Sequence, residues 1–224
     1  DVCSSDLNHD GTAAGVSDMC GNIWEHVGGI RFLNGQVQII PNNEAAAGAD
    51  QSPNSKEWTA VYTLDGDPVY YNVKDGEIML QPTAPEGKDY DGVPFCDLHE
   101  RADMDVPDKL IELGLYPAPG YESSEYFWLD TNGEHCVSRG GYWYNGADAG
   151  VVSLYGGNSR SNSDTSIGFR SAFVRYSDES DNLDPAPKIE NSCSGSLPES
   201  LPELVGHTIT VTTKITIGKE KGHE

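Results

Sequence analysis

RGGYWYNGADAGVVSLYGGNSRSNSDTSIGFR, residues 139–170, is the most informative stretch of the chain. Its glycines provide tight turns or close backbone approach, and the relevant ones are Gly140, Gly141, Gly146 and Gly150. Five side chains are apolar enough to anchor a core: Trp143, Val151, Leu154, Ile167 and Phe169. The alternation of these framework residues with polar positions predicts a packed scaffold that displays a variable surface.

The positions between the framework residues are a mixture of Tyr, Ser, Gly, Asn and Asp. This is the composition of antibody binding loops, in which Tyr gives rigid amphipathic contact area and small polar residues adapt. Three tyrosines among glycines and polar residues favour an exposed binding face over a core role. The candidate ligand-binding residues are Tyr142, Tyr144, Asn145, Asp148, Ser153, Tyr155, Gly157, Asn158, Asp164 and Ser166. The composition suits recognition better than catalysis.

The motifs GGxWxxGAxAG and NxRSNSxTxIGFR in this stretch resemble the variable repeat of variable proteins made by diversity-generating retroelements. A second stretch, DMCGNIWEH at residues 18–26, looks like the DxxGNxWEW element of the same superfamily. His26 replaces the usual second Trp, so we expect the packing there to differ. The resemblance covers residues 15–174. It implies an α+β, C-type lectin-like fold of the sulfatase-modifying-factor type, rich in strands and loops and with few short helices.

The same resemblance implies a phage or prophage protein that binds a host-surface or other macromolecular target. The structural framework would be Trp24, Glu25, Arg139, Gly141, Trp143, Arg160, Gly168, Phe169 and Arg170. We expect its large aromatic side chains in the core, because aromatic rings dominate core burial. The three arginines are expected to pin loops through hydrogen bonds to carboxylates or carbonyls. Glu25 is expected to be a buried partner, because a single carboxylate lacks the second group that acid–base chemistry needs.

Enzymes of the superfamily need residues that this sequence does not offer at the matching places. Formylglycine-generating enzymes use a copper-binding cysteine pair shortly after the GG, and residues 142–151 contain no cysteine. Thiolates are the ligands that Cu(I) requires. Related sulfoxide synthases use a histidine cluster of a helical domain. We therefore expect no catalytic residues and no enzymatic activity. The alternatives are a metal oxidoreductase with displaced site residues and a calcium-dependent carbohydrate-binding lectin.

No cofactor is expected, and a structural calcium ion is the open alternative. Residues 6–11 mimic the start of a calcium loop, but Ser17 occupies the twelfth position, where a bidentate acid is needed. The stretch CDLHERADMD, residues 96–105, gathers His99 with several acids at a spacing that fits no zinc template, so a solvated acidic loop is expected. Three of its acids are the candidates for calcium: Asp97, Glu100 and Asp103.

The net charge of −22, from 36 acidic and 14 basic residues, argues against nucleic acids and anionic membranes as partners, because both would be repelled. No run of about 18 apolar residues indicates membrane insertion. The five cysteines lack CxxC spacing, so neither a zinc site nor a disulfide framework is implied, although a Cys96–Cys136 bridge stays open. The expected partner is a protein or glycan on a host-cell surface. By analogy, the protein would form trimers on a virion tail or cell surface.

Composition divides the chain into four parts. Residues 1–7 resemble the translation of a sequencing adapter, so a non-native start is expected. Residues 8–176 are predicted to be one lectin-like domain that lacks its N-terminal part. Residues 177–206 are acidic and rich in Pro and Ser, which is typical of a flexible linker. Residues 207–224 form a tail in which 207–218 alternate like a strand.

Local patterns predict a mostly β framework. The Asn34-Gly35 pair predicts a hairpin between residues 30–33 and 36–40. Further strands are expected at 23–27, 59–64, 69–73, 77–80 and 126–130, with turns at 65–66 and 75–76. One helix is expected at 107–113, with Gly114 at its end, and 82–105 is expected to be loop. Residues 135–139 and 168–174 should pair as the strands that frame the variable segment, residues 139–170.

Overall fold

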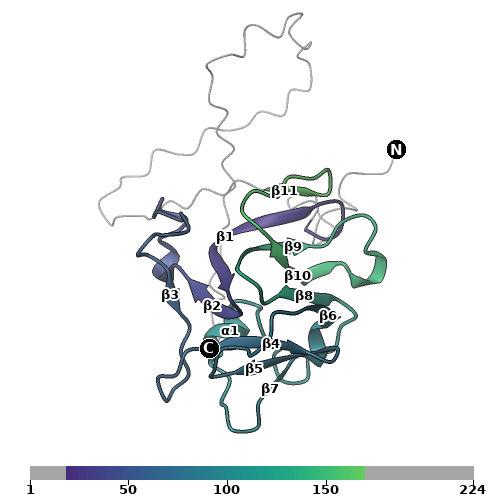
Figure 1. Ribbon diagram of the computed structural model, residues 1–224. Helices are drawn as coiled ribbons and strands as arrows, with labels where there is room; N and C mark the ends of the chain where they lie inside the picture. Colours follow the sequence, from purple (N-terminus) through teal and green to yellow (C-terminus); the bar gives the residue numbers. More distant parts are fainter. Residues whose placement is uncertain (1–18, 170–224) are drawn as a thin grey trace, which may run out of the picture. The chain divides into compact units, whose positions relative to one another are not determined.

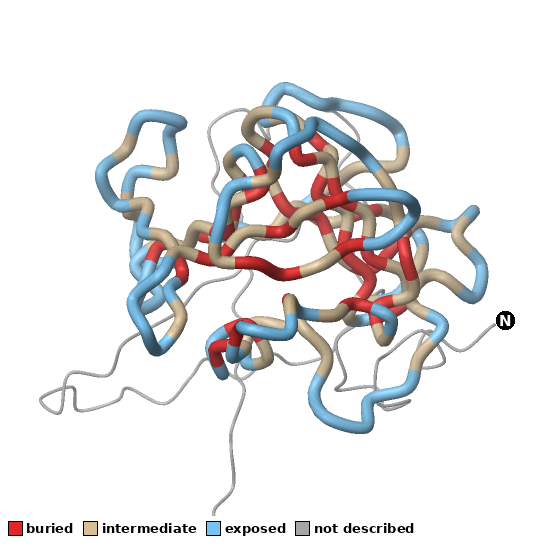
Figure 2. The backbone as a smooth tube through the Cα atoms, turned by 60° about the horizontal axis from the view of Figure 1, so that its bottom comes forward, coloured by how far each residue is buried: buried red, intermediate tan, exposed pale blue. Residues whose placement is uncertain are grey.

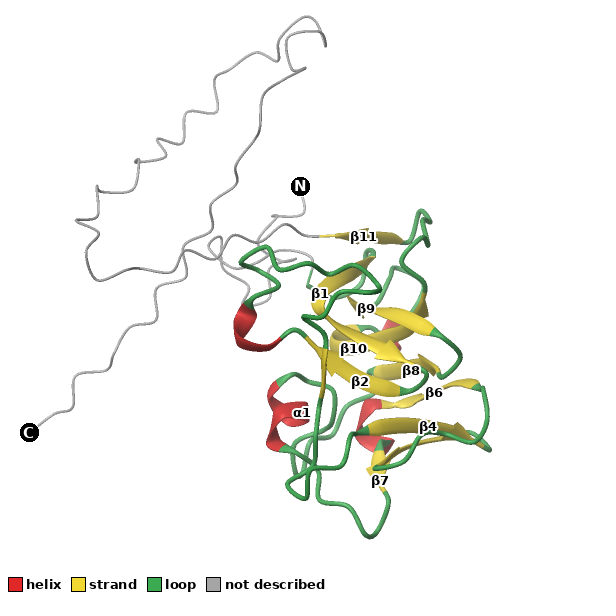
Figure 3. Ribbon diagram, turned by 60° about the vertical axis from the view of Figure 1, so that its left-hand side comes forward, coloured by secondary structure: helices red, strands yellow, loops and turns green. Residues whose placement is uncertain are grey.

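One sheet of eleven strands is the framework of the described chain, which is residues 19–169 of a computed structural model (Figure 1). The strands are β1 (Trp24–Leu33), β2 (Gln36–Ile39), β3 (Thr59–Ala60), β4 (Tyr70–Lys74), β5 (Glu77–Gln81), β6 (Tyr90–Pro94), β7 (His99–Glu100), β8 (Tyr126–Asp130), β9 (Glu134–Gly140), β10 (Gly150–Asn158) and β11 (Ile167–Phe169). The helical segments are α1 (Asp108–Glu112), η2 (Pro41–Asn43), η3 (Phe95–Asp97) and η4 (Gly146–Asp148). The fold is therefore β-rich and loop-rich with few short helices, as predicted (Figure 3).

Several predictions lie outside the described residues. These are the non-native start, the calcium-like residues 6–17, Arg170, the linker and the tail strand. The described residues belong to a unit that spans Asp1–Ser171, and the second unit is Ala172–Glu224.

The hairpin predicted around Asn34-Gly35 is confirmed. β1 and β2 pair antiparallel, from Ile30 opposite Ile39 to Leu33 opposite Gln36. Asn34 has φ 50° and Gly35 has φ 78°, so both turn residues are in the left-handed region that a type I′ turn requires. The second predicted pair, β4 and β5, is joined by Asp75-Gly76 in the same way. Residues 126–130 and 107–113 also form the predicted strand and helix.

Two predictions are wrong, one about where strands occur and one about how strands pair. Residues 82–105 were expected to be loop, yet they contain β6, η3 and β7. The sequence of β6, YDGVP, has little intrinsic β preference, and its pairing with β8 supplies the hydrogen bonds that make it a strand. The described part of the framing strand 168–174 pairs with β1, in parallel, and not with β9. β1 thus lies between β9 and β11.

β10 is a further strand that the sequence patterns did not reveal. It runs through the middle of the variable segment, antiparallel to β9 and parallel to β8. Its register with β9 shifts twice, between Gly150 and Leu154 and between Tyr155 and Asn158. Such irregularities break the strict alternation by which a strand is recognised in a sequence.

Buried hydrophobic residues of β1, β2, β4, β5 and β8 form one core cluster, and Figure 2 shows the buried segments gathered near the centre of the described chain. Along β8, Phe127 and Leu129 are fully buried, whereas Tyr126 and Trp128 alternate with them and therefore lie on the opposite face. Tyr71 of β4 is buried in the core and donates its hydroxyl hydrogen to the Leu115 carbonyl just after α1. The core thereby joins α1 to the sheet.

Candidate ligand-binding surface

Three consecutive aromatic residues project from the connection between β9 and β10. Trp143 is 72% exposed and Tyr144 is 73% exposed, while Tyr142 is half-buried. Their rings contact one another, with centroids 5.4 Å apart for Trp143 and Tyr144 and 6.3 Å apart for Tyr142 and Tyr144. We call Tyr142, Trp143 and Tyr144 the aromatic triplet. Its rings form a continuous aromatic surface, and two of the three are mostly exposed.

Two glycines direct the triplet away from the sheet. Gly140 has φ 92° and Gly141 has φ 77°, a conformation that residues with a side chain rarely adopt. A Cβ atom at Gly141 would also lie 2.7 Å from the Cβ atom of Ala149, and one at Gly140 would lie 3.0 Å from the Met19 carbonyl oxygen. The chain therefore turns outward here because glycine alone fits both positions.

Hydrogen bonds hold the backbone of the triplet in place. The Tyr142 amide donates to Asn145 Oδ1 at 2.8 Å, and the Asn145 amide donates to the Tyr142 carbonyl at 2.9 Å. The Trp143 amide donates to the Asn22 carbonyl at 3.1 Å. Further along the loop, Ser124 Oγ donates to the Ala147 carbonyl at 2.8 Å. The loop is thus anchored on both sides of the exposed rings.

The predicted core role of three framework side chains is wrong. Besides Trp143, Phe169 is 78% exposed and Val151 is also exposed. Trp143 follows the outward glycine turn, and Phe169 lies at the described end of β11, beside β1. A prediction from apolar character alone was therefore wrong for these residues, because the local direction of the chain decides whether a side chain points into the core or toward solvent. Of the other core candidates, Trp24 and Leu154 are buried.

Two predicted binding residues lie inside the protein, which corrects the expectation that they face a ligand. Ser153 is fully buried and donates its hydroxyl hydrogen to the Asp148 carbonyl. Asn158 is buried at the end of β10, where its Nδ2 lies 3.4 Å from Ser138 Oγ and its Oδ1 accepts from Asn162 at 2.9 Å. Both side chains support the backbone of the variable segment.

Tyr155 belongs to a second aromatic cluster, on the outer face of the sheet. Its ring contacts Trp24 at 5.7 Å, Tyr90 at 6.3 Å and Trp128 at 6.4 Å between centroids. Burial, and a hydrogen bond with Tyr155, raise the pKa of Tyr90. Gly157 permits this arrangement, since a Cβ atom there would lie 3.0 Å from the Tyr155 ring. Tyr155 therefore packs within this cluster and not with the aromatic triplet.

The loop after β10 carries the last predicted binding residues. Asp164 is exposed, and its Oδ1 accepts from the Ser166 amide at 2.9 Å and from Ser166 Oγ at 3.0 Å. The hydrogen bonds from the Ser166 backbone and side chain lower the pKa of Asp164. Asp164 and Ser166 thus form a turn that stays charged and accessible. Asp148, in η4, is half-buried.

Arginine side chains tie the variable segment to the rest of the fold. Arg139 Nη2 donates to the carbonyls of Leu113 at 2.7 Å and Gly114 at 3.0 Å, and Nη1 donates to that of Val152 at 3.3 Å. Burial lowers the pKa of Arg139 to about 10. Glu25 lies opposite Arg139 in the β1–β9 pair, in the register that also places Gly168 beside Glu25.

Arg160 is bound to a carboxylate that the sequence patterns did not single out. Its Nε and Nη2 atoms each lie 2.8 Å from an oxygen of Glu134, and Arg31 Nη1 lies 2.6 Å from Glu134 Oε1. The guanidinium of Arg31 also lies over the Trp58 ring, 4.5 Å from its centroid. The distance of more than a hundred residues between Arg31 and Glu134 hid this network from any local pattern.

His26 stands where the related motif has a second Trp, and its packing is polar. His26 pairs with Ser138 across β1 and β9, and its Nδ1 lies 3.1 Å from Ser138 Oγ. The neighbouring Trp24 instead meets Trp128 edge to face, with centroids 5.6 Å apart. The outer face of the sheet therefore changes from aromatic to polar between these two positions of β1.

No group of three or more His, Cys, Asp or Glu side chains in residues 19–169 is arranged to hold a metal ion. Among the calcium candidates, Glu100 accepts a hydrogen bond from Tyr116 and Asp103 pairs with Arg101.

Cys96 and Cys136 are free thiols, so the bridge between them is not formed. None of the helices in the described part of the chain is long and apolar enough to cross a membrane.

The chain matches no protein-family model, and no curated protein sequence matches it either. The candidate site is defined by the geometry of its own residues. That geometry combines exposed aromatic rings, an anchored loop and a charged turn. Rings of this kind make large noncovalent contacts with little loss of side-chain entropy.

Proposed function

We propose that this is a non-catalytic binding protein whose display surface recognises a macromolecular target. The display surface consists of the aromatic triplet, Asp148 and the Asp164–Ser166 turn. The target would be a protein or glycan on the surface of a host cell, and the protein would act on a virion tail or a cell surface, as a trimer. The C-type lectin-like fold of the sulfatase-modifying-factor type and the origin in a diversity-generating retroelement belong to this proposal and rest on the sequence motifs.

The observation that carries the proposal is the exposure of the aromatic triplet on an anchored loop. Burying a Tyr or Trp side chain removes about 150–250 Å² from water, so these rings are the residue types that dominate binding interfaces. An anchored loop loses less conformational entropy on binding than a mobile one does. Exposed rings that are already ordered therefore favour association with a partner.

The burial pattern narrows the set of positions that can vary. Substitutions at exposed positions usually change stability by less than about 0.5 kcal/mol, so the side chains of Tyr144 and Asp164 can be exchanged at small cost. Ser153 and Asn158 are buried and hydrogen-bonded, and their replacement would leave buried polar groups without partners. Asn145 holds the triplet in place, so its exchange would change the geometry of the surface.

A binding experiment tests the proposal. The full chain, fluorescently labelled, is offered to a panel of bacterial cells and to glycan and protein arrays, and each hit is measured again with Tyr142→Ala/Trp143→Ala/Tyr144→Ala. The triple variant should bind at least about tenfold more weakly. Tyr62→Ala/Leu64→Ala is the control, because it removes two exposed apolar side chains from a different loop and should bind normally. Unchanged binding by the triple variant, with an unchanged melting temperature, would refute the role of the triplet.

Two further measurements separate the alternatives. Loss of binding on chelation would favour a calcium-dependent lectin, and stoichiometric copper or iron would favour a metal oxidoreductase. Sequencing of the source locus tests the variable character itself. A nearby second copy of the segment encoding residues 139–170, together with a reverse transcriptase, supports diversification. An intact locus without them would make the protein a binder of fixed specificity.

A further inference from the structure

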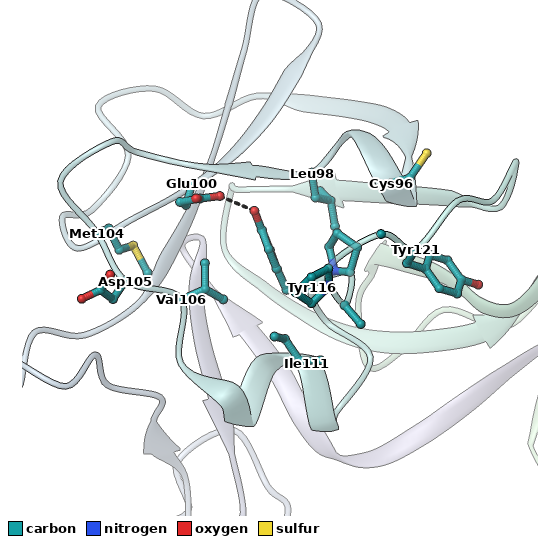
Figure 4. A pocket seen from close by; sticks show the side chains of 13 residues that line it. Cys96, Leu98, Glu100, Met104, Asp105, Val106, Ile111, Tyr116 and Tyr121 are labelled. Atoms are coloured by element: carbon teal, nitrogen blue, oxygen red, sulfur yellow. Dashed lines mark hydrogen bonds between the residues drawn. The ribbon is translucent and has the colours of Figure 1, made fainter.

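A cavity of about 420 Å³ is lined by residues between Cys96 and Tyr121, and none of them belongs to the variable segment. One wall is formed by the chain from η3 through β7 to Val106, and the other by α1 and the residues that follow it, up to Tyr121 (Figure 4). The volume falls within the range of small-ligand pockets, which is about 300–1,000 Å³. The cavity is therefore large enough to hold a small organic group.

The middle of the cavity is lined by apolar side chains. Leu98 and Met104 are buried parts of the core, and Ile111 of α1 faces them across the cavity. At one end, Tyr121 packs edge to face on Phe95, with centroids 5.8 Å apart, and donates its hydroxyl hydrogen to Glu125 at 2.8 Å. A ligand that enters would meet a preformed apolar surface.

The opposite end of the cavity carries negative charge. Glu100 and Asp105 lie there, at the left of Figure 4, and the lining includes no Lys, Arg or His. Glu100 Oε2 accepts the hydroxyl hydrogen of Tyr116. Burial, and this hydrogen bond, raise the pKa of Tyr116, so the phenol keeps its proton as the donor to Glu100. The second oxygen of Glu100 remains to accept from a ligand, and Asp105 adds an exposed negative charge at the same end of the cavity.

We propose that this cavity binds an organic ammonium group carried on an apolar stem. The stem would lie against Leu98, Met104 and Ile111, where its burial is favourable. The ammonium group would lie at the Glu100 carboxylate and near the Tyr116 ring, which attracts cations through its π face, with the charge of Asp105 at the same end of the cavity. The net charge of −22 raises the local concentration of such a cation. This site is additional to the display surface, and its failure would leave the proposed function untouched.

Calorimetry with the full chain and n-hexylammonium tests the proposal, with n-hexanol as the neutral probe of the same length. The amine should bind at least about tenfold more tightly than the alcohol. Glu100→Gln/Asp105→Asn should reduce the affinity for the amine about tenfold. Glu44→Gln/Glu57→Gln is the matched control, because it removes the same charge from exposed positions outside the cavity and should change the affinity less than about twofold.

Methyl NMR shifts locate the ligand. Hexylammonium should shift the Met104 and Ile111 methyl signals and leave that of Ile39 unchanged. A lysine in a short peptide with blocked ends is the second probe. If the peptide binds as well as hexylammonium, the natural source of the group is a polypeptide side chain, and if it does not, the source is a free amine. The proposal is overturned if the amine does not bind at about 10 mM, if hexanol binds equally, or if the Glu100/Asp105 variant binds as the wild type does.

Discussion

The indole ring of Trp128 covers Gly92 on the neighbouring strand. The two residues are opposite each other in the β6–β8 pair, and a Cβ atom at position 92 would lie 2.1 Å from Trp128 Cδ1. The ring cannot move aside freely, because Trp24 meets it edge to face and Tyr126 lies 5.1 Å from it between centroids. Gly92 is thus the position that lets the outer aromatic cluster lie flat on β6.

Gly92→Ala is expected to destabilise the protein by about 1–3 kcal/mol, because the added methyl group displaces the indole ring from its packed position. Gly87→Ala is the matched control. A Cβ atom there meets no other atom within 4 Å, so this variant should be neutral or slightly stabilising. Urea unfolding at equilibrium measures both. Equal effects of the two substitutions would contradict the close contact.

Glu134→Gln is expected to reduce the free energy of unfolding by about 1.5–3 kcal/mol near neutral pH, since Glu134 joins Arg160 to Arg31 through charged hydrogen bonds. The hydrogen bond from Arg160 is the main cause that lowers the pKa of Glu134 below 4.5, and Arg31 adds to it. A carboxyl group whose pKa is lower in the folded than in the unfolded state stabilises the folded state at pH values above its unfolded-state pKa. This contribution is lost as the pH falls through the pKa of the same group in the folded state.

The difference between Glu134→Gln and the wild type should therefore shrink as the pH falls below 4.5. Unfolding curves recorded across acidic and neutral pH check this. Glu112→Gln serves as the comparison, because it removes an exposed ion pair with Lys109 and should cost at most about 0.5 kcal/mol. A pH-independent difference for Glu134→Gln would show that the ion pairs contribute nothing.

Arg139→Met is expected to cost about 2–4 kcal/mol, because the carbonyls of Leu113, Gly114 and Val152 lose their buried donors. Arg139→Lys should recover only part of the loss, since one ammonium group cannot reproduce a planar guanidinium that reaches several acceptors. Arg101→Met, at a more exposed pair with Asp103, should cost much less. Thermal unfolding compares the three, and equal stability of the lysine variant and the wild type would argue against the proposed geometry.

Trp143→Ala is expected to change stability by less than about 0.5 kcal/mol, because the side chain is mostly exposed. Trp24→Ala should cost about 3–5 kcal/mol, because Trp24 is buried and packs on Trp128 and Tyr155. Chemical denaturation of both variants is the measurement. A large loss for Trp143→Ala would restore the core role that the sequence suggested for it.

Local sequence signals predicted the elements whose conformation depends on near neighbours. Asn34-Gly35 and Asp75-Gly76 define their hairpins because left-handed turn residues are read directly from residue type. The strand at 126–130 was predicted from its aromatic residues, and the structure adds that its fully buried residues alternate with half-buried ones. The coarse β-rich class followed from these elements.

Long-range pairing escaped prediction. β6 becomes a strand because β8 offers it a partner, and β11 joins β1 because the chain returns to it from a distant part of the sequence. The Glu134 network joins residues that no local window contains. Within the candidate site, the exposure of Tyr144 agrees with the sequence composition, but the burial of Ser153 and Asn158 depends on the register of β10.

The sequence by itself determined the turns, the hairpins, the acidic charge and the aromatic and polar composition of the variable segment, because these depend on residue type and near neighbours. The tertiary structure alone decided which of those residues reach solvent. Trp143 faces outward because Gly140 and Gly141 turn the chain there, and Tyr155 packs on Trp128 because β10 lies beside β8. Exposure is a property of the packed sheet, since it depends on which strands the chain brings together.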